Sequence, residues 1–195
     1  MKKQAEIIKQ LTDRELLLNL YLTQMIMLII AVVLSFLLYR DPLYPLSLIY
    51  WDLNHLLLGI GVAIIVVIFE LFLAKILPKH LFDDGGINER IFRNRSIFRI
   101  AFLSFIVGFS EEILFRGVIQ SSFGLIAASL IFAIIHFRYL QNLFLFTFTI
   151  VLSFVIGLLF FYTGNLLTVI ICHMVVDMLL GWCIRLGVLN VRSNE

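Results

Sequence analysis

The sequence predicts an all-α protein that crosses a membrane several times. Of its 195 residues, 62% are hydrophobic and only 14% are charged, whereas a soluble domain is roughly half apolar. The mean hydropathy is +1.04, and the charged residues are gathered in a few short segments. Most of the surface must therefore face lipid rather than water. Segments that cross lipid must be helical, because the bilayer offers no partners to open backbone groups.

Six segments are apolar over the roughly 20 residues that a helix needs to cross a bilayer. They cover approximately residues 16–39, 56–77, 97–117, 119–137, 143–162 and 166–186. A polar segment over residues 78–96 separates the second span from the third. The polar first 14 residues lack the apolar core and cleavage site of a signal peptide, so the first span is expected to remain as an anchor. We predict one integral membrane domain over residues 1–195, a polytopic bundle of about six spans.

The basic residues are distributed unevenly around these spans. If the N-terminus is cytoplasmic, the opposite side holds only Arg40, and Arg116 lies within a span. The cytoplasmic segments then hold all the others: Lys2, Lys3, Lys9, Arg14, Lys75, Lys79, Arg90, Arg93, Arg95, Arg99, Arg138, Arg185 and Arg192. Because an excess of Lys and Arg marks cytoplasmic loops, both termini are predicted to be cytoplasmic. The basic segment 78–96 is interpreted first as this topology signal, with contact to anionic lipid as the alternative.

Several classes of protein and site do not fit the composition. A net charge of +2 without an aromatic and basic patch argues against nucleic acid as a partner. Cys172 and Cys183 fall in one apolar segment without metal-ligand spacing, so both are interpreted as packing residues and not as a disulfide framework. The His-Glu-x-x-His zinc signature does not occur in the sequence.

Three charged residues lie close together in the third predicted span. They are Glu111, Glu112 and Arg116, and each costs on the order of 3 kcal/mol on membrane-insertion scales. Helical spacing places Glu112 and Arg116 one above the other, so this pair can neutralise itself. Glu111 lies about 100° round the helix, without that partner. Such a carboxylate is a candidate general base, whereas a purely structural ion-pair network explains Glu112 and Arg116 but not Glu111.

Two histidines also lie in predicted spans. His136 ends an apolar segment and shares a helix face with Phe132, and His173 shares a face with Asp177 four residues later. A lone histidine in a span is more often a hydrogen-bonded packing residue than a ligand. An acid beside it can orient the imidazole or help to hold a water or a metal ion.

Three spans thus supply polar groups that are expected to converge on a wet cavity within the membrane. One interpretation is that Glu111 activates a water to attack a carbonyl, while a histidine polarises the carbonyl or stabilises the oxyanion. The alternative is a zinc-like ion that lowers the pKa of water, with Glu111, His136, His173 and Asp177 as its ligands. The sequence leaves these two open. His55 and His80, in polar segments, are not expected to take part.

The ordered set of motifs resembles a known family. Glu-Glu-x-x-x-Arg at 111–116, Phe-x-x-x-His at 132–136 and His-x-x-x-Asp at 173–177 are similar to those of the CPBP family. This family, also called ABI, comprises CAAX proteases and bacteriocin-processing intramembrane endopeptidases. The resemblance covers about residues 102–181 and implies a catalytic core over residues 97–189. Its eukaryotic members remove the C-terminal tripeptide of prenylated CAAX proteins.

The resemblance also implies roles for single residues. It makes Glu111 the water-activating base, Glu112 and Arg116 its electrostatic supports, and His136 and His173 further catalytic residues. Asp177 stands where the family often has Asn. The short chain suggests a multi-pass protein of a bacterial cytoplasmic membrane. Its expected substrate is then a membrane-associated or membrane-delivered peptide or protein and not a prenylated CAAX protein.

Three other functions compete with this interpretation. Ser110 before a later histidine is faintly similar to a rhomboid-type serine peptidase, but most of that motif is missing. Buried carboxylates and histidines also occur in ion- or proton-coupled transporters, although no inverted repeat is present here. A non-catalytic, bacteriocin-immunity-type membrane protein would keep the same fold.

One geometric difficulty accompanies the proposed cavity. On a straight third helix Glu111 lies beyond the membrane midplane, whereas His136 ends the fourth helix near the cytoplasmic side. The two meet only if the fourth helix is short, tilted or irregular, and we therefore predict irregular helices there. A separation of more than about 10 Å between them would rule out a shared site, because general-base catalysis needs hydrogen-bond reach, directly or through one water.

Overall fold

The computed structural model describes residues 11–189, and their regular structure is entirely helical. The α-helices are α2 (Asp13–Tyr39), α3 (Leu53–Ile76), α4 (Ile87–Phe92), α5 (Ile97–Glu112), α6 (Ser121–Ile135), α7 (Leu143–Thr163) and α8 (Leu166–Arg185). Three short 3₁₀ helices connect them: η1 (Tyr44–Leu48), η2 (Lys79–Phe82) and η4 (Phe137–Gln141). A π-helical segment, η3 (Ile113–Gln120), continues α5. The predicted all-α membrane bundle is confirmed.

Polar residues set where the long helices begin. Thr12 and Glu15 form a capping box at the start of α2. The side chains of Asp52, Ser96, Asn142 and Asn165 cap α3, α5, α7 and α8 by accepting hydrogen bonds from backbone N–H groups within the first turn. Because these residues directly precede the apolar runs, the starts of these helices agree closely with the predicted spans.

The third and fourth spans are separated at Gly124 and not, as predicted, between residues 117 and 119. Gly124 has φ 84° and ψ 171°, a conformation outside the helical region. The Phe115 and Phe132 rings lie 4.9 Å apart, whereas a straight helix would separate residues at this spacing by about 25 Å. The chain therefore folds back at Gly124, and α6 packs on η3. The helical segment after the fold-back is short, because it ends at Ile135.

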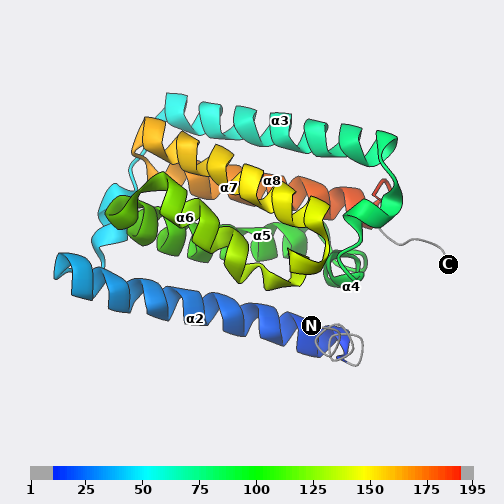
Figure 1. The fold of residues 1–195 in the computed structure, drawn as a ribbon, viewed down its shortest axis with the longest axis horizontal. Helices are drawn as coiled ribbons and strands as arrows, with labels where there is room; N and C mark the ends of the chain where they lie inside the picture. The colour runs from blue at the N-terminus through cyan, green and yellow to red at the C-terminus, as the bar shows by residue number, and fades with distance from the viewer. Residues whose placement is uncertain (1–10, 190–195) are drawn as a thin grey trace.

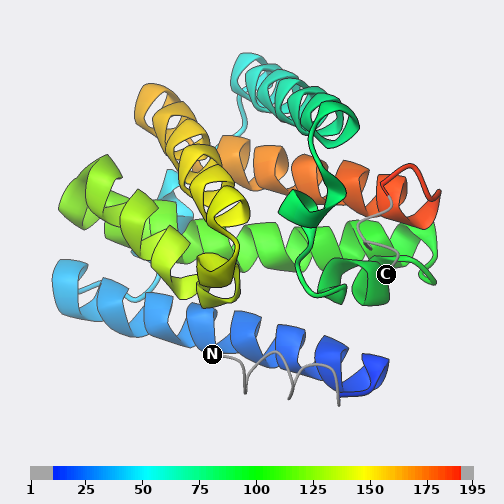
Figure 2. The same cartoon turned by 45° about the vertical axis from the view of Figure 1, so that its right-hand side comes forward.

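Within residues 11–189, five helices are long and apolar enough to cross a membrane, and one of them is the run Ile97–Ile135 that folds back at Gly124. Because this run folds back, it accounts for two of the six predicted crossings, and the other four helices account for one each. Figures 1 and 2 show α5 and α8 in the middle of the bundle, with α2 on one side and α3 on the other. The main contacts agree, because α5 packs on α8, α3 on α8 and α2 on α5.

The start of α2 and the end of α8 lie at the same end of the bundle, on the right in Figure 1. That end also carries α4, η2 and the basic residues of the connecting segments. It holds Arg14, Lys75, Lys79, Arg90, Arg93, Arg95, Arg99, Arg138 and Arg185, and the opposite end holds Arg40. Lys2, Lys3, Lys9 and Arg192 lie outside the described residues. The asymmetry fits the orientation rule, and the cytoplasmic side of the termini stays a prediction.

Gly124→Ala is expected to destabilise the protein by about 1–3 kcal/mol, because only glycine adopts this backbone conformation without strain. No atom lies within 4 Å of the added Cβ, so the cost comes from the backbone alone. Gly61→Ala in α3 is the matched control, since its Cβ also meets open space but its backbone is helical. It should stabilise by up to about 1 kcal/mol. Unfolding of both variants in detergent measures the difference, and equal effects would contradict the prediction.

Candidate functional site

The acidic pair lies at the end of α5, where the helix changes to the π-helical η3. Glu111 is 4% exposed, Glu112 is fully buried and Arg116 is 1% exposed. Residues of η3 form a wider helical turn, a feature often found at functional sites. The three charges thus lie within the bundle and not on its lipid-facing surface.

Glu112 and Arg116 form the predicted internal ion pair. Arg116 Nη1 lies 3.2 Å from Glu112 Oε1. Its Nη2 donates to the Ser153 carbonyl at 2.9 Å and to the Ser153 hydroxyl at 3.0 Å, which ties the pair to α7. The guanidinium also lies over the Phe132 ring, 5.0 Å from its centroid. The buried guanidinium of Arg116 therefore contacts residues of α5, α6 and α7.

A close approach of α5 and α8 brings His173 to this pair. A Cβ on Gly108 would lie 3.1 Å from the Met174 nitrogen and 3.4 Å from the His173 Cβ, so a larger residue would have to push the two helices slightly apart. His173 donates its Nδ1–H to Glu112 Oε1 at 2.6 Å. Glu112 Oε1 thus accepts from both His173 and Arg116, which fixes the imidazole plane and directs Nε2 away from Glu112.

His136 reaches the same place from the C-terminal end of α6. Its Nδ1–H donates to the Phe132 carbonyl at 2.7 Å, which directs Nε2 inward. His136 Nε2 and His173 Nε2 each lie 4.0 Å from the same oxygen, Glu111 Oε2. The predicted meeting of Glu111 and His136 is therefore confirmed. The short α6 after Gly124 explains it, because His136 lies only 12 residues beyond the fold-back.

Aromatic rings hold His136 on both sides. The Phe132 ring lies 4.5 Å from its ring and the Tyr139 ring stacks 6.0 Å from it. Tyr139 belongs to η4, outside the spans, where it bonds Arg138 and receives a cation–π contact from it at 4.5 Å. Burial raises the pKa of the Tyr139 phenol, so the ring stays neutral.

Asp177 completes the cluster on α8. Its Oδ2 lies 3.7 Å from His173 Nε2, which is longer than a hydrogen bond. The side chains of Asp177 and His136 are 28% and 20% exposed, against 6% for Glu111. Asp177 and His136 are therefore the more exposed members of the cluster, and Glu111 lies deeper. All six predicted site residues belong to one connected cluster.

The separations suit a bound water better than zinc. Zinc bonds of about 2.0–2.2 Å bridge 4.0 Å only at an angle of about 135° or more, whereas tetrahedral zinc needs about 109°. Two hydrogen bonds of about 2.8 Å bridge it at about 90°. Within residues 11–189 no three His, Cys, Asp or Glu side chains are arranged to hold a metal ion. In this arrangement the atoms of the alternative ligand set, Glu111, His136, His173 and Asp177, lie 3.7–4.0 Å apart, which is wider than the roughly 3.3 Å between ligands of tetrahedral zinc.

The sequence interpretation missed Gln24, a buried residue of α2. Gln24 Nε2 lies 3.5 Å from Glu111 Oε1, and its Oε1 accepts a hydrogen bond of 2.7 Å from Ser110. Ser110 also donates to the Ile106 carbonyl, and no described histidine bonds its hydroxyl. Ser110 is therefore not placed as a serine nucleophile. A glutamine on the same helix face as the small residues Ala31 and Ser35 was the available signal for Gln24.

Glu70 is a second polar residue within a span that the sequence interpretation did not single out. It lies in the span-length helix α3, which runs parallel to α8 (Figure 1). A Cβ on Gly59 would lie 2.7 Å from the Thr168 carbonyl oxygen, which sets the register of the two helices. Glu70 follows Gly59 by eleven residues and Leu179 follows Thr168 by eleven, so the two lie at the same level along the parallel helices. Glu70 is therefore near Asp177, with which it interacts electrostatically.

Gln24→Leu is expected to lower catalytic turnover by up to about 100-fold, because Glu111 Oε1 loses its polar contact and the carboxylate can rotate away from the histidines. Thr23→Val is the control, since the neighbouring Thr23 is exposed and bonds only the Asn19 carbonyl. The measurement is kcat and KM for a cleaved peptide. The loss should fall on kcat, and equal rates for both variants would contradict the positioning role.

The fold and the cluster define the class of protein: a multi-pass integral membrane protein with a cluster of carboxylates and histidines among its apolar helices. A family model described as type II CAAX prenyl endopeptidase Rce1-like matches residues 93–179, which include all six site residues. The YpbD protein of Bacillus subtilis, described as uncharacterized, is 40% identical over 167 residues, which are 84% of this chain and 87% of YpbD. No solved structure matches.

The chain belongs to the Rce1-like family of CAAX-type intramembrane proteases, within the CPBP group. The resemblance predicted from the three motifs is thereby confirmed. The class of activity at the level of the family is peptide-bond hydrolysis within a membrane, and the relative YpbD is bacterial.

Proposed function

We propose that the chain is an intramembrane endopeptidase that hydrolyses a peptide bond of a membrane-associated or membrane-delivered peptide or protein. The observation that carries this proposal is the position of Glu111 Oε2, 4.0 Å from the Nε2 atoms of both His136 and His173. A water between these three atoms lies within hydrogen-bond reach of a carboxylate base. Residues 97–189 are the proposed catalytic core, and Gln24 of α2 supports it from outside.

In the proposed reaction, Glu111 takes a proton from this water and the oxygen attacks the carbonyl carbon of the scissile bond. The resulting tetrahedral intermediate carries a negative oxygen that needs a hydrogen-bond donor. A protonated His173 has a second N–H at Nε2, because its Nδ1–H is held by Glu112. The proton on Glu111 then passes to the leaving nitrogen as the C–N bond breaks, which regenerates the carboxylate.

Asp177 has a supporting role in this proposal. A carboxylate accepts hydrogen bonds and does not donate them, so Asp177 is not the donor to the oxyanion that an asparagine would be. Its charge, 3.7 Å from His173 Nε2, instead stabilises the protonated imidazole. Protonated His173 is therefore the proposed oxyanion donor, whereas His136, whose Nδ1–H donates to the Phe132 carbonyl, presents Nε2 as an acceptor toward the water. Because the separations do not suit zinc, we assign the activity to the glutamate type and route no step through a metal.

The test is cleavage of peptides by the purified protein in detergent, with and without a chelator. Wild type is compared with Glu111→Ala, His173→Ala and Ser110→Ala. We expect cleavage to be lost in the first two variants, to persist in Ser110→Ala and to be insensitive to the chelator. Loss on chelation would support the metal alternative, and loss only in Ser110→Ala would support a serine peptidase.

The alternatives from other functional classes are tested with the same protein in liposomes. Proton or ion flux without cleavage would support a transporter. Protection of cells from a bacteriocin that persists in Glu111→Ala, with no cleavage by wild type, would support a non-catalytic immunity protein. Either result would overturn the proposed function.

A further inference from the structure

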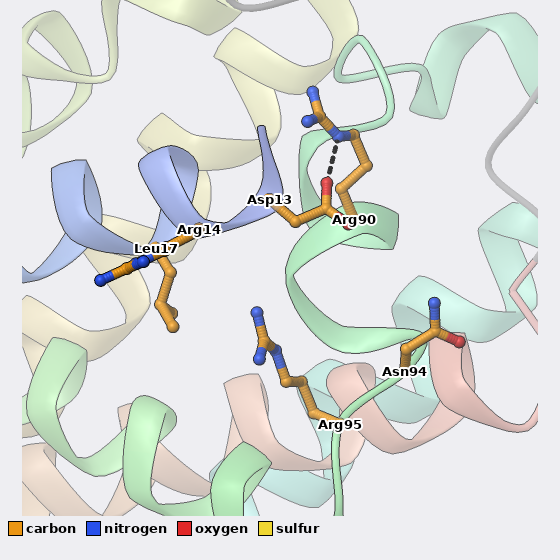
Figure 3. Close-up of a pocket in the computed structure, with 6 residues that line it drawn as sticks. All are labelled: Asp13, Arg14, Leu17, Arg90, Asn94 and Arg95. Atoms are coloured by element: carbon orange, nitrogen blue, oxygen red, sulfur yellow. Dashed lines mark hydrogen bonds and ion pairs between the residues drawn. The ribbon is translucent and has the colours of Figure 1, made fainter. Parts of the chain in front are cut away.

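A second polar site lies at the end of the bundle where α2 begins. It is a cavity of about 350 Å³ between the start of α2 and the segment that joins α4 to α5 (Figure 3). Its lining residues are Asp13, Arg14, Leu17, Arg90, Asn94 and Arg95. It is separate from the Glu111 cluster, because Gln24, which contacts Glu111, lies about 16 Å further along α2 than Asp13.

The cavity carries a surplus of positive charge. Three arginines against one aspartate leave a formal charge of +2 in its lining. Asp13 is engaged by Arg90, whose Nε lies 2.8 Å from Asp13 Oδ1. Within the described part of the chain, neither Arg14 nor Arg95 forms an ion pair with a carboxylate. Figure 3 shows the Arg95 guanidinium extended into the space between Leu17 and Asn94.

Apolar surface begins directly beside this charge. Leu17 packs on the hydrophobic cluster of Ile87, Ile91 and Leu103. Phe98, three residues after Arg95, is 87% exposed at the first turn of α5, and Phe102 follows it one turn later at 57%. In a bilayer these rings face the acyl chains, so the cavity lies at the level of the headgroups. A ligand with an anionic head and an apolar tail matches both surfaces.

We propose that this cavity binds the headgroup phosphate of an anionic phospholipid. Guanidinium groups match phosphate oxygens in charge and geometry, and the volume lies within the range of small-ligand sites. Arg14 belongs to α2 and Arg95 to the segment that joins α4 to α5, so a phosphate held by both would tie the start of α2 to the start of α5. A topology signal alone needs only basic residues on one side and does not need two arginines from separate segments to line one cavity.

The test is lipid binding by the purified full-length protein, read as the shift in its thermal unfolding in detergent. Phosphatidylglycerol is compared with phosphatidylcholine and with inorganic phosphate. The pocket variant is Arg14→Gln with Arg95→Gln. The matched control, Lys75→Gln with Lys79→Gln, removes the same charge from the same end of the bundle, outside the cavity. The readout does not depend on peptidase activity.

We expect phosphatidylglycerol to stabilise wild type and the control, and the pocket variant to bind it at least about tenfold more weakly than the control. An equal loss of phosphatidylglycerol binding in both variants would show that the lipid responds to general surface charge and not to the cavity, which would overturn the proposal. Equal stabilisation by phosphatidylcholine or by inorganic phosphate would also overturn it, in favour of an unspecific lipid or a free anion.

A charge-preserving variant keeps the test informative if the glutamine variant does not fold. Arg14→Lys with Arg95→Lys retains both charges but removes the planar forks that pair with phosphate. Weaker binding of phosphatidylglycerol by this variant is the expected result, and unchanged binding would contradict a site built on guanidinium groups.

Discussion

Glu111→Gln is expected to lower the rate of peptide hydrolysis by at least about 10³-fold and to leave the protein folded. General-base catalysis alone contributes about 10²–10⁴-fold, and glutamine has the shape of glutamate without its basic oxygen. The amide fills the same space between Gln24 and the two histidines. The measurement is the initial rate of cleavage at saturating peptide, with thermal unfolding as the check on folding.

Ser110→Ala is the neighbouring control for this prediction. Its hydroxyl bonds Gln24 and the Ile106 carbonyl and faces no histidine, so its loss should change the rate by less than about tenfold. Wild-type cleavage by a folded Glu111→Gln protein would refute the assignment of the base. Complete loss of cleavage in Ser110→Ala alone would indicate that the serine, and not Glu111, carries out the reaction.

Arg116→Met is expected to cause the largest loss of stability, about 3–5 kcal/mol, because it leaves the fully buried Glu112 carboxylate without its cation. The guanidinium bonds to Ser153 and the contact with Phe132 are lost as well. Denaturant unfolding in detergent measures the change. Arg99→Met on the exposed face of α5 is the control and should change stability by less than about 0.5 kcal/mol.

A double-mutant cycle isolates the ion pair from these other contacts. Glu112→Gln combined with Arg116→Met should destabilise by clearly less than the sum of the two single changes, since neither partner is then left charged and alone. Additive effects would show that the pair contributes nothing as a pair and that packing explains the loss.

A single atom, Glu112 Oε1, takes part both in the stabilising ion pair and in the positioning of a proposed catalytic residue. It accepts from Arg116 Nη1 and from His173 Nδ1. The hydrogen bond to Glu112 determines which ring nitrogen of His173 faces Glu111, so the buried ion pair also orients a proposed catalytic residue. Arg116→Met should therefore lower activity even at temperatures where the variant remains folded.

Local features were predictable from the sequence. The length and hydropathy of each apolar run depend only on neighbouring residues, so the spans beginning near residues 16, 56, 97, 143 and 166 were predicted close to their observed starts. The Glu112–Arg116 pair was predictable for the same reason, because its partners lie four residues apart on one helix. The identity of the remaining site residues followed from the cost of polar groups in lipid and from the family motifs.

Composition over single helices indicated the crossing segments and the polar residues within them, except for the boundary between the third and fourth spans, which lies at Gly124. The tertiary structure decided which atoms face one another. The fold-back at Gly124 shortens α6 and brings His136 to Glu111, and the close approach at Gly108 brings His173 to Glu112. Gln24 reaches the site only because α2 packs on α5. These contacts join residues far apart in the chain, and helical periodicity carries no information about them.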